Sequence, residues 1–292
     1  MILLEVAFLA VFWAWAFTAL VFLRNTFVER LPLAHTPQDA GLVAETVRFQ
    51  ATDGVWLEGW KIAGALGRSW IILCHGAGSN RSDVVDIAAG LRTAGFNTFL
   101  FDFRGHGGSN GRTTSFGWTE QRDLEGALAF LGQQPEVLAA PYGVYGISMG
   151  AAVAILVGAR DERIGAVAAD SSYTSLEDTL VRHLELLYPY LPSVPFQGFL
   201  LFTYRCRFGI WPRQIAPVSD IGRLSPRPLL LIQGADDPRM PLQGAQELLA
   251  KAAAPKELWV VQGAGHLGGF AQDPSAYLGK VTAFFHRALH SE

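Results

Sequence analysis

The chain has 292 residues, which is enough for one large domain or two small ones. Half of its residues are hydrophobic and 17% are charged, which excludes an intrinsically disordered protein and allows a sizeable core. The formal net charge is −3, so the chain has no basic excess that would indicate a general nucleic-acid binder. Two cysteines, Cys74 and Cys206, are too few for a disulfide scaffold, and we expect lone buried thiols.

The first segment, residues 2–23, is apolar except for Glu5 and Thr18. As a helix it would be about 33 Å long, enough to cross a hydrocarbon layer of about 30 Å. The sequence therefore predicts a single-pass transmembrane helix over residues 1–24, with a cleaved signal peptide or a soluble core helix as alternatives. Basic residues follow this segment, at Arg24 and Arg30, and none precedes it, which favours a cytoplasmic location for the rest of the chain.

Residues 25–45 contain prolines, a glycine and scattered polar groups, and we interpret them as a tether. The remaining residues, 46–292, are expected to form one globular unit. It begins with a hairpin signal, because alternating residues at 46–50 and 55–62 flank the tight-turn dipeptide Asp53-Gly54.

After the hairpin, short continuous apolar runs alternate with helical patterns. Continuous apolar runs suit strands that are buried on both faces, as in a parallel sheet. The sequence therefore predicts an α/β fold with a doubly wound, mostly parallel sheet and an antiparallel N-terminal hairpin. The expected strands are 70–74, 97–101, 142–145, 164–169, 229–232 and 258–261, and the expected helices are 82–94, 118–131, 149–159, 242–253 and 274–289.

One stretch, residues 172–221, lacks a clear strand and is rich in Leu, Tyr, Phe and Pro. A structureless loop of this length is improbable in a compact domain, so we predict a helical cap insertion over one edge of the sheet. Such an insertion would form a lid or the wall of an acyl pocket, with plain packing as the alternative.

The strongest chemical signal is the G-x-S-x-G motif from Gly146 to Gly150. It follows a predicted strand and opens a predicted helix, which is the strand–turn–helix context in which this motif presents a nucleophile. Ser148 is therefore the candidate nucleophile.

A serine hydroxyl needs a base that removes its proton and an acid that orients the base. His266 is the candidate base, since it lies in a glycine-rich loop after the last predicted strand. Asp237 is the candidate acid and follows the strand at 229–232. Asp236 is its main competitor, and Asp170, which we expect to cap the next turn, is a weaker one.

The oxyanion of an acyl-transfer intermediate needs amide donors. We predict the Met149 amide, next to the nucleophile, and the Ala77 amide in the loop after the strand at 70–74. His75 and Gly76 of the same loop are candidate substrate-binding residues, and His75 is expected to order the loop rather than act as a second base.

The segment Asp102–Ser109 follows the strand at 97–101 and is expected to be a turn with an internal Asp102–Arg104 pair. No metal-ligand spacing, P-loop or strand-linked G-x-G-x-x-G occurs, so we expect neither a metal nor a nucleotide cofactor.

Five motifs together resemble the α/β-hydrolase superfamily: H-G-A-G at 75–78, D-F-R-G-H-G-G-S at 102–109, G-I-S-M-G at 146–150, G-A-D-D-P at 234–238 and G-A-G-H at 263–266. The resemblance covers about residues 46–290 and is closest to the membrane-associated BEM46-like type. It implies Ser148, Asp237 and His266 as a catalytic triad, and Ala77 and Met149 as oxyanion donors.

The resemblance also implies hydrolysis of esters or thioesters. The apolar insertion suggests an apolar or lipid-like substrate, and no nucleic-acid partner is expected. The alternatives are a peptidase or an acyltransferase with the same triad, and a membrane-anchored binding protein that has lost catalysis.

Overall fold

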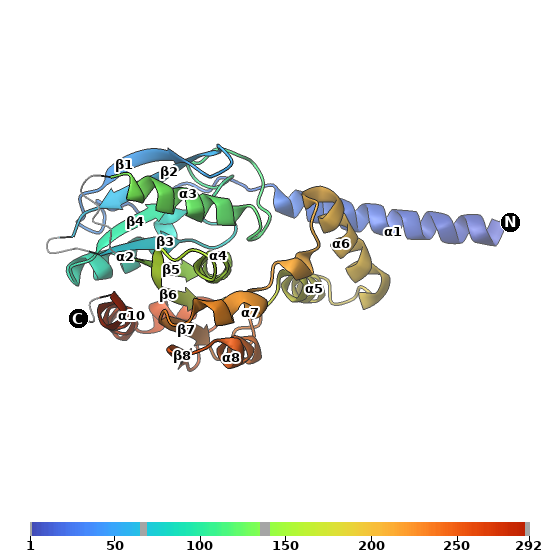
Figure 1. Ribbon diagram of the computed structural model, residues 1–292. Helices are drawn as coiled ribbons and strands as arrows, with labels where there is room; N and C mark the ends of the chain where they lie inside the picture. Colours follow the sequence, from blue (N-terminus) through green and yellow to red (C-terminus); the bar gives the residue numbers. More distant parts are fainter. Residues whose placement is uncertain (1, 65–68, 135–140, 290–292) are drawn as a thin grey trace.

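The computed structural model describes residues 2–64, 69–134 and 141–289. Within these ranges the chain forms one eight-stranded sheet in the order β1-β2-β4-β3-β5-β6-β7-β8 (Figure 1). The pairs β1–β2 and β2–β4 are antiparallel, and all the others are parallel. The strands are β1 (Glu45–Gln50), β2 (Trp56–Ile62), β3 (Trp70–Cys74), β4 (Asn97–Phe101), β5 (Tyr142–Ile147), β6 (Ile164–Asp170), β7 (Leu229–Gly234) and β8 (Lys256–Val261).

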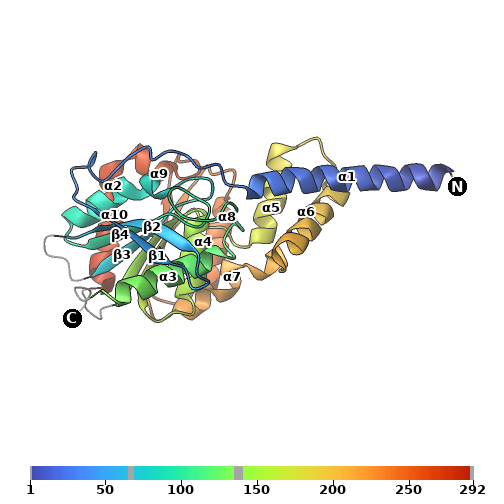
Figure 2. The same ribbon diagram turned by 90° about the horizontal axis from the view of Figure 1, so that it is seen from above.

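Helices cover both faces of this sheet (Figures 1 and 2). The α-helices are α1 (Ile2–Thr26), α2 (Val85–Thr93), α3 (Glu120–Gly132), α4 (Met149–Gly158), α5 (Leu176–Leu187), α6 (Ser193–Phe208), α7 (Pro217–Asp220), α8 (Leu242–Lys251), α9 (Gly268–Gln272) and α10 (Pro274–Leu289), with short 3₁₀ turns at Arg81–Val84, Pro212–Gln214 and Ile221–Leu224. The doubly wound, mostly parallel sheet is therefore confirmed.

The local sequence explains the central strands. All five residues of β3 and all five of β4 are buried, because each strand lies between two others with helices above and below. The N-terminal hairpin forms at the expected place. Gly54 has φ +84°, a left-handed conformation that glycine adopts without strain, and its amide donates to the Ala51 carbonyl.

The chain between β6 and β7 is helical, as its lack of strand signals predicts. Its helices α5 and α6 lie beyond the carboxyl ends of the strands and beside α1, which extends away from the sheet (Figures 1 and 2). A separate apolar cluster holds this part together, with Phe22 of α1, Tyr204 of α6 and Leu176 of α5 all buried. The Phe22 and Tyr204 rings lie 5.8 Å apart.

Among the described residues, no helix is both long enough and apolar enough to cross a membrane. The structure therefore does not confirm the transmembrane helix predicted for residues 1–24. The inner end of α1 contacts protein instead, where Thr18 and Phe22 are each 4% exposed.

The chain just after α1 is bound by hydrogen bonds to the loop that follows β4. The Val28 amide donates to the Arg112 carbonyl at 2.9 Å, and the Thr114 amide donates to the Thr26 carbonyl at 2.9 Å. The Arg30 guanidinium donates to three carbonyls of the loop after β4. The C-terminal end of α1 is thus held in a fixed position relative to the sheet. The domain limits 1–24, 25–45 and 46–292 remain predictions.

Both cysteines are free, as expected. Cys74 is buried in β3, whereas Cys206 lies exposed on α6, so the expectation of two buried thiols is wrong for Cys206. Its neighbours in the sequence, Arg205 and Arg207, are also exposed.

Candidate active site

Ser148 sits on a strained turn between β5 and α4. Its φ of +52° and ψ of −116° are unusual for a residue with a side chain, and they raise its hydroxyl above the sheet. The turn requires glycine on both sides. A Cβ on Gly146 would lie 2.4 Å from the Gly150 carbonyl oxygen, and one on Gly150 would lie 2.3 Å from the Cys74 carbonyl oxygen.

The three predicted residues Ser148, His266 and Asp237 lie in a row, each within hydrogen-bonding distance of the next. His266 Nε2 lies 3.2 Å from Ser148 Oγ, and His266 Nδ1 lies 2.7 Å from Asp237 Oδ2. The loops that carry Asp237 and His266 pack closely against each other. A Cβ added to Gly234, just before the Asp237 loop, would lie only 2.4 Å from the carbonyl oxygen of Ala264 in the His266 loop. The structure thus brings together three side chains from the ends of β5, β7 and β8.

The Asp237 carboxylate is buried and held by several donors. Burial raises its pKa, but the hydrogen bonds from His266, Met240 and Arg239 outweigh burial and lower the pKa below its usual value. The two backbone amides donate to Oδ1 at 2.8 and 3.0 Å. Asp237 therefore stays ionised and can hold the His266 imidazole in one orientation.

Gln233, the fifth residue of β7, supports the same carboxylate. Its side-chain amide donates to Asp237 Oδ2 at 3.3 Å and to the Met240 carbonyl at 2.7 Å. Sequence reasoning missed this residue. Its only signal is a polar side chain in an apolar strand, four positions before the acid.

Neither competing carboxylate takes the place of Asp237 beside His266. Asp236 is exposed, and its amide donates to the Ala264 carbonyl. Asp170 does not cap a turn as expected. Its buried carboxylate accepts hydrogen bonds from Tyr277 Oη at 2.5 Å and from Ser171 Oγ at 2.8 Å.

The loop after β3 runs beside Ser148. Neither the Ala77 amide nor the Met149 amide donates a hydrogen bond to any residue that the structure describes, so both are available to a ligand. The next amide, that of Gly78, donates to His106 Nε2 at 3.2 Å. Ala77 and Gly78 line the cavity above Ser148.

His75 and Gly76 belong to the same loop beside Ser148. His75 is fully buried, its Nε2 accepts a hydrogen bond from the Phe103 amide at 3.0 Å, and its Nδ1 lies 2.7 Å from the Gly76 carbonyl. Burial lowers the pKa of His75 well below its usual value, so the ring is neutral and fixes the loop. A Cβ on Gly76 would lie 3.5 Å from the Ser148 Cβ. The substrate-binding role predicted for both residues remains a prediction.

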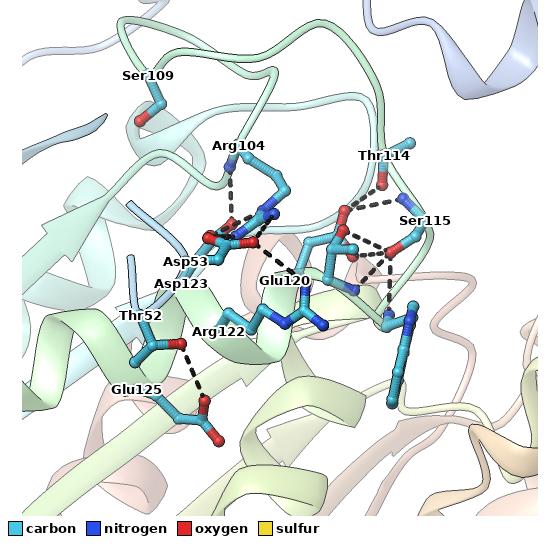
Figure 3. Close-up of polar contacts among 12 residues, drawn as sticks. Thr52, Asp53, Arg104, Ser109, Thr114, Ser115, Glu120, Arg122, Asp123 and Glu125 are labelled. Atoms are coloured by element: carbon cyan, nitrogen blue, oxygen red, sulfur yellow. Dashed lines mark hydrogen bonds and ion pairs between the residues drawn. The ribbon is translucent and has the colours of Figure 1, made fainter. Parts of the chain in front are cut away.

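The internal pair predicted after β4 is wrong, because both members bind partners from other elements. Asp102 accepts hydrogen bonds from the Arg81 guanidinium and the Arg81 amide. Arg104 forms ion pairs with Asp53 of the hairpin turn and with Asp123 of α3 (Figure 3).

A cavity of about 430 Å³ opens above Ser148 and His266. Its walls are mostly apolar and come from α1, α5 and α6, and its size is typical of sites for small-molecule ligands. The contribution of α1, which includes Phe17, Val21 and Phe22, is not visible in the sequence motifs. Within the described ranges, no cluster of three His, Cys, Asp or Glu side chains could hold a metal ion.

Comparison with known proteins gives consistent results. Residues 71–279 match the alpha/beta hydrolase family. The chain is 32% identical over 237 residues to the uncharacterized protein Rv2307c of Mycobacterium tuberculosis, covering 80% of this chain and 75% of that protein. It is 26% identical over 212 residues to the protein bem46 of Schizosaccharomyces pombe, covering 70% and 64%.

Among solved structures, the esterase Pf2001 of Pyrococcus furiosus superposes with a TM-score of 0.76 and 27% identity, covering 90% of this chain and 98% of that one. The resemblance to bem46 is therefore distant, and the similarity to an esterase extends over nearly the whole fold.

Proposed function

The chain belongs to the α/β-hydrolase family, and from this membership we propose that it is a serine hydrolase that cleaves carboxylic esters or thioesters. The observation that carries the proposal is the row Asp237–His266–Ser148, with separations of 2.7 and 3.2 Å, below an apolar cavity. The likeness to the Pyrococcus furiosus esterase supports the same reaction class.

The proposed reaction is acyl transfer to water. His266 removes the proton of Ser148 Oγ, which attacks the carbonyl carbon of the ester. The Ala77 and Met149 amides bind the negative oxygen of the tetrahedral intermediate. His266 then passes its proton to the departing alcohol or thiol. Water, activated by the same imidazole, attacks the acyl-enzyme, releases the carboxylic acid and restores Ser148.

Replacement of the nucleophile tests this proposal. We expect the full chain to hydrolyse p-nitrophenyl esters and to react covalently with a fluorophosphonate probe. Ser148→Ala removes the nucleophile, so it should abolish labelling and lower turnover by about 10⁴-fold or more. Ser172→Ala is the control, because Ser172 is buried and its hydroxyl donates to the Tyr173 carbonyl. Labelling that survives in Ser148→Ala would contradict the proposal.

The same experiment separates the alternatives. A peptidase would label with the probe and cleave amide substrates in preference to esters, and an acyltransferase would label but need an acyl acceptor other than water. A binding protein that has lost catalysis would be folded and would neither label nor turn over any ester.

We also propose that the outer part of α1 contacts a lipid surface. Large apolar side chains are exposed there, among them Phe8 at 69%, Trp13 at 67% and Leu9 at 52%. Apolar groups left in water favour transfer into a bilayer interface. Membrane association and the cytoplasmic location of the hydrolase body both remain proposals.

A further inference from the structure

The cavity above Ser148 is closed on one side by α1, a helix that lies outside the hydrolase motifs. Phe17, Val21 and Phe22 of α1 line it, opposite Leu180 and Leu184 of α5. The α1 and α5 side chains are separated by more than 150 positions in the sequence. The cavity therefore exists only while α1 is held against the cap.

Several contacts hold α1 there. The C-terminal end of α1 is bound to the loop at residues 113–118, because the Thr114 amide donates to the Thr26 carbonyl. The cap is bound to the same loop, since Tyr204 Oη of α6 donates to the Ser115 carbonyl at 2.8 Å. One loop thus binds both α1 and α6.

The loop itself is organised by a buried carboxylate, that of Glu120 at the start of α3 (Figure 3). Glu120 accepts hydrogen bonds from the hydroxyl groups of Thr114 and Ser115 at 2.9 and 2.6 Å. It also accepts from the Ser115 and Gly117 amides, both at 2.9 Å. Four donors on one carboxylate give the loop a single conformation.

The lining chemistry indicates what the cavity holds. Close to the nucleophile it is polar, with Ser148, His266 and the Ala77 backbone. Between α1 and α5 most of the lining side chains are leucine, valine and phenylalanine, and the polar ones are Thr18, Asn25, Thr179 and His183. An ester with an extended apolar chain matches this gradient, because its carbonyl would lie at the polar end. In an acyl-enzyme the acyl group stays on the serine while the leaving group departs, so the enclosed apolar part suits the acyl chain.

We propose that α1 is the acyl-chain wall of the active site, so that Val21 and Phe17, with Leu180 across the cavity, determine which chain lengths are accepted. The substrates are then esters of medium-chain or long-chain acids. This inference rests on the proposed serine-hydrolase function, and it assigns to α1 a role in substrate selection.

The test narrows the cavity from either side. Val21→Trp and Leu180→Trp each place a large ring where the chain would lie, and both positions are half-buried. Leu20→Trp is the matched control, because Leu20 precedes Val21 on the same helix, is 68% exposed and is absent from the lining. The measured quantity is the ratio of kcat/KM for p-nitrophenyl decanoate to that for p-nitrophenyl acetate.

We expect this ratio to fall about tenfold or more in Val21→Trp and in Leu180→Trp, because a filled pocket rejects the added methylenes. Leu20→Trp should keep the wild-type ratio. Equal ratios in all four proteins would overturn the inference while leaving the serine-hydrolase function intact.

A binding measurement keeps the two proposals apart. Dodecanoate is titrated calorimetrically into Ser148→Ala, alone and combined with Val21→Trp or Leu20→Trp, so that no turnover is needed. Binding that Val21→Trp weakens and Leu20→Trp leaves intact supports the chain pocket even if no ester is hydrolysed. Binding that is equal in all three proteins, or absent from Ser148→Ala, overturns it.

Discussion

At the residue scale, the proposed site depends on an ionised Asp237 carboxylate that orients the His266 imidazole. Asp237 is buried yet keeps a lowered pKa, since the hydrogen bonds of His266 and of two backbone amides outweigh the cost of burial. The neighbouring carboxylate, Asp236, is exposed and takes no part in the row. Substituting each of these two neighbouring aspartates in turn therefore compares the effect of the two candidate acids on activity.

Asp237→Asn is expected to lower kcat by about 10⁴-fold, because an amide cannot stabilise the imidazolium and can hold the wrong tautomer. Asp236→Asn should leave kcat near its wild-type value. Both are checked by steady-state hydrolysis of a p-nitrophenyl ester, with circular dichroism as a control for folding. A larger loss from Asp236→Asn than from Asp237→Asn would show that the acid is assigned to the wrong residue.

A second prediction concerns His106, which holds the Gly78 amide. Burial lowers the pKa of His106, although the Arg104 carbonyl and nearby carboxylates act in the opposite direction. The folded protein therefore keeps this ring neutral at pH values where the unfolded chain, with a histidine pKa of about 6.5, takes up a proton. The free energy of unfolding should fall as the pH drops below about 6.5, by up to about 1.4 kcal/mol per pH unit for one such histidine.

The measurement is urea unfolding at pH 8, 6.5 and 5. In His106→Gln the side chain can still accept from Gly78 and donate to Arg104 but does not titrate, so the loss of stability toward pH 5 should be smaller than in the wild type. His75, whose pKa is also lowered by burial, accounts for the part that remains. An unchanged pH dependence in His106→Gln would refute this explanation.

At the element scale, the order of strands and helices follows closely from the sequence, whereas the long-range contacts do not. The strands β3 and β4 begin and end at the predicted residues, because a short apolar run between turn signals has few other solutions in a layered fold. The turn at Ser148 was equally predictable, since its two glycines are required by contacts within a few residues.

Other features depend on residues far apart in the chain. Nothing in the local pattern indicates that Arg81 rather than Arg104 binds Asp102, because the direction of the intervening turn decides it. The position of α1 depends on hydrogen bonds from residues 26–31 to residues 80 and 107–114, which periodicity cannot reveal.

The docking of α1 should depend on Phe22. Phe22→Ala removes a ring that is 4% exposed and packs on Tyr204, a change that costs about 3–5 kcal/mol in a buried site. We expect faster amide hydrogen exchange in α1 and faster tryptic cleavage at Arg24, measured by mass spectrometry. Phe8→Ala, at an exposed position of the same helix, is the control and should show neither change. Equal protection in both variants would mean that other contacts hold the helix.

At the scale of the whole molecule, the exposed apolar outer part of α1 gives the protein an uneven surface. The hydrolase body carries charged and polar groups, whereas α1 extends away from it (Figure 2), and the aromatic side chains Phe8, Phe12 and Trp13 of its outer part are exposed. Contiguous exposed apolar groups favour contact with a lipid surface or another apolar surface.

This arrangement predicts that the full chain floats with phosphatidylcholine vesicles in a sucrose gradient. The double variant Phe8→Glu/Trp13→Glu should stay in the soluble fraction. Burying each apolar ring in the bilayer contributes about 1.5–3 kcal/mol to the free energy of membrane binding, and a carboxylate at the same position loses that contribution. Val43→Glu, which changes an exposed valine between α1 and β1, is the control. Flotation of the double variant equal to that of the wild type would contradict the proposal of lipid contact through α1.

The wall that α1 contributes to the cavity also bears on how substrate range can change during evolution. Val21 and Phe17 are remote from the sheet and from the turn that holds Ser148, so substitutions there reshape the cavity while the fold keeps its core. Laboratory selection for new ester preferences can therefore begin with a library at these two positions, which lie outside the main core of the sheet.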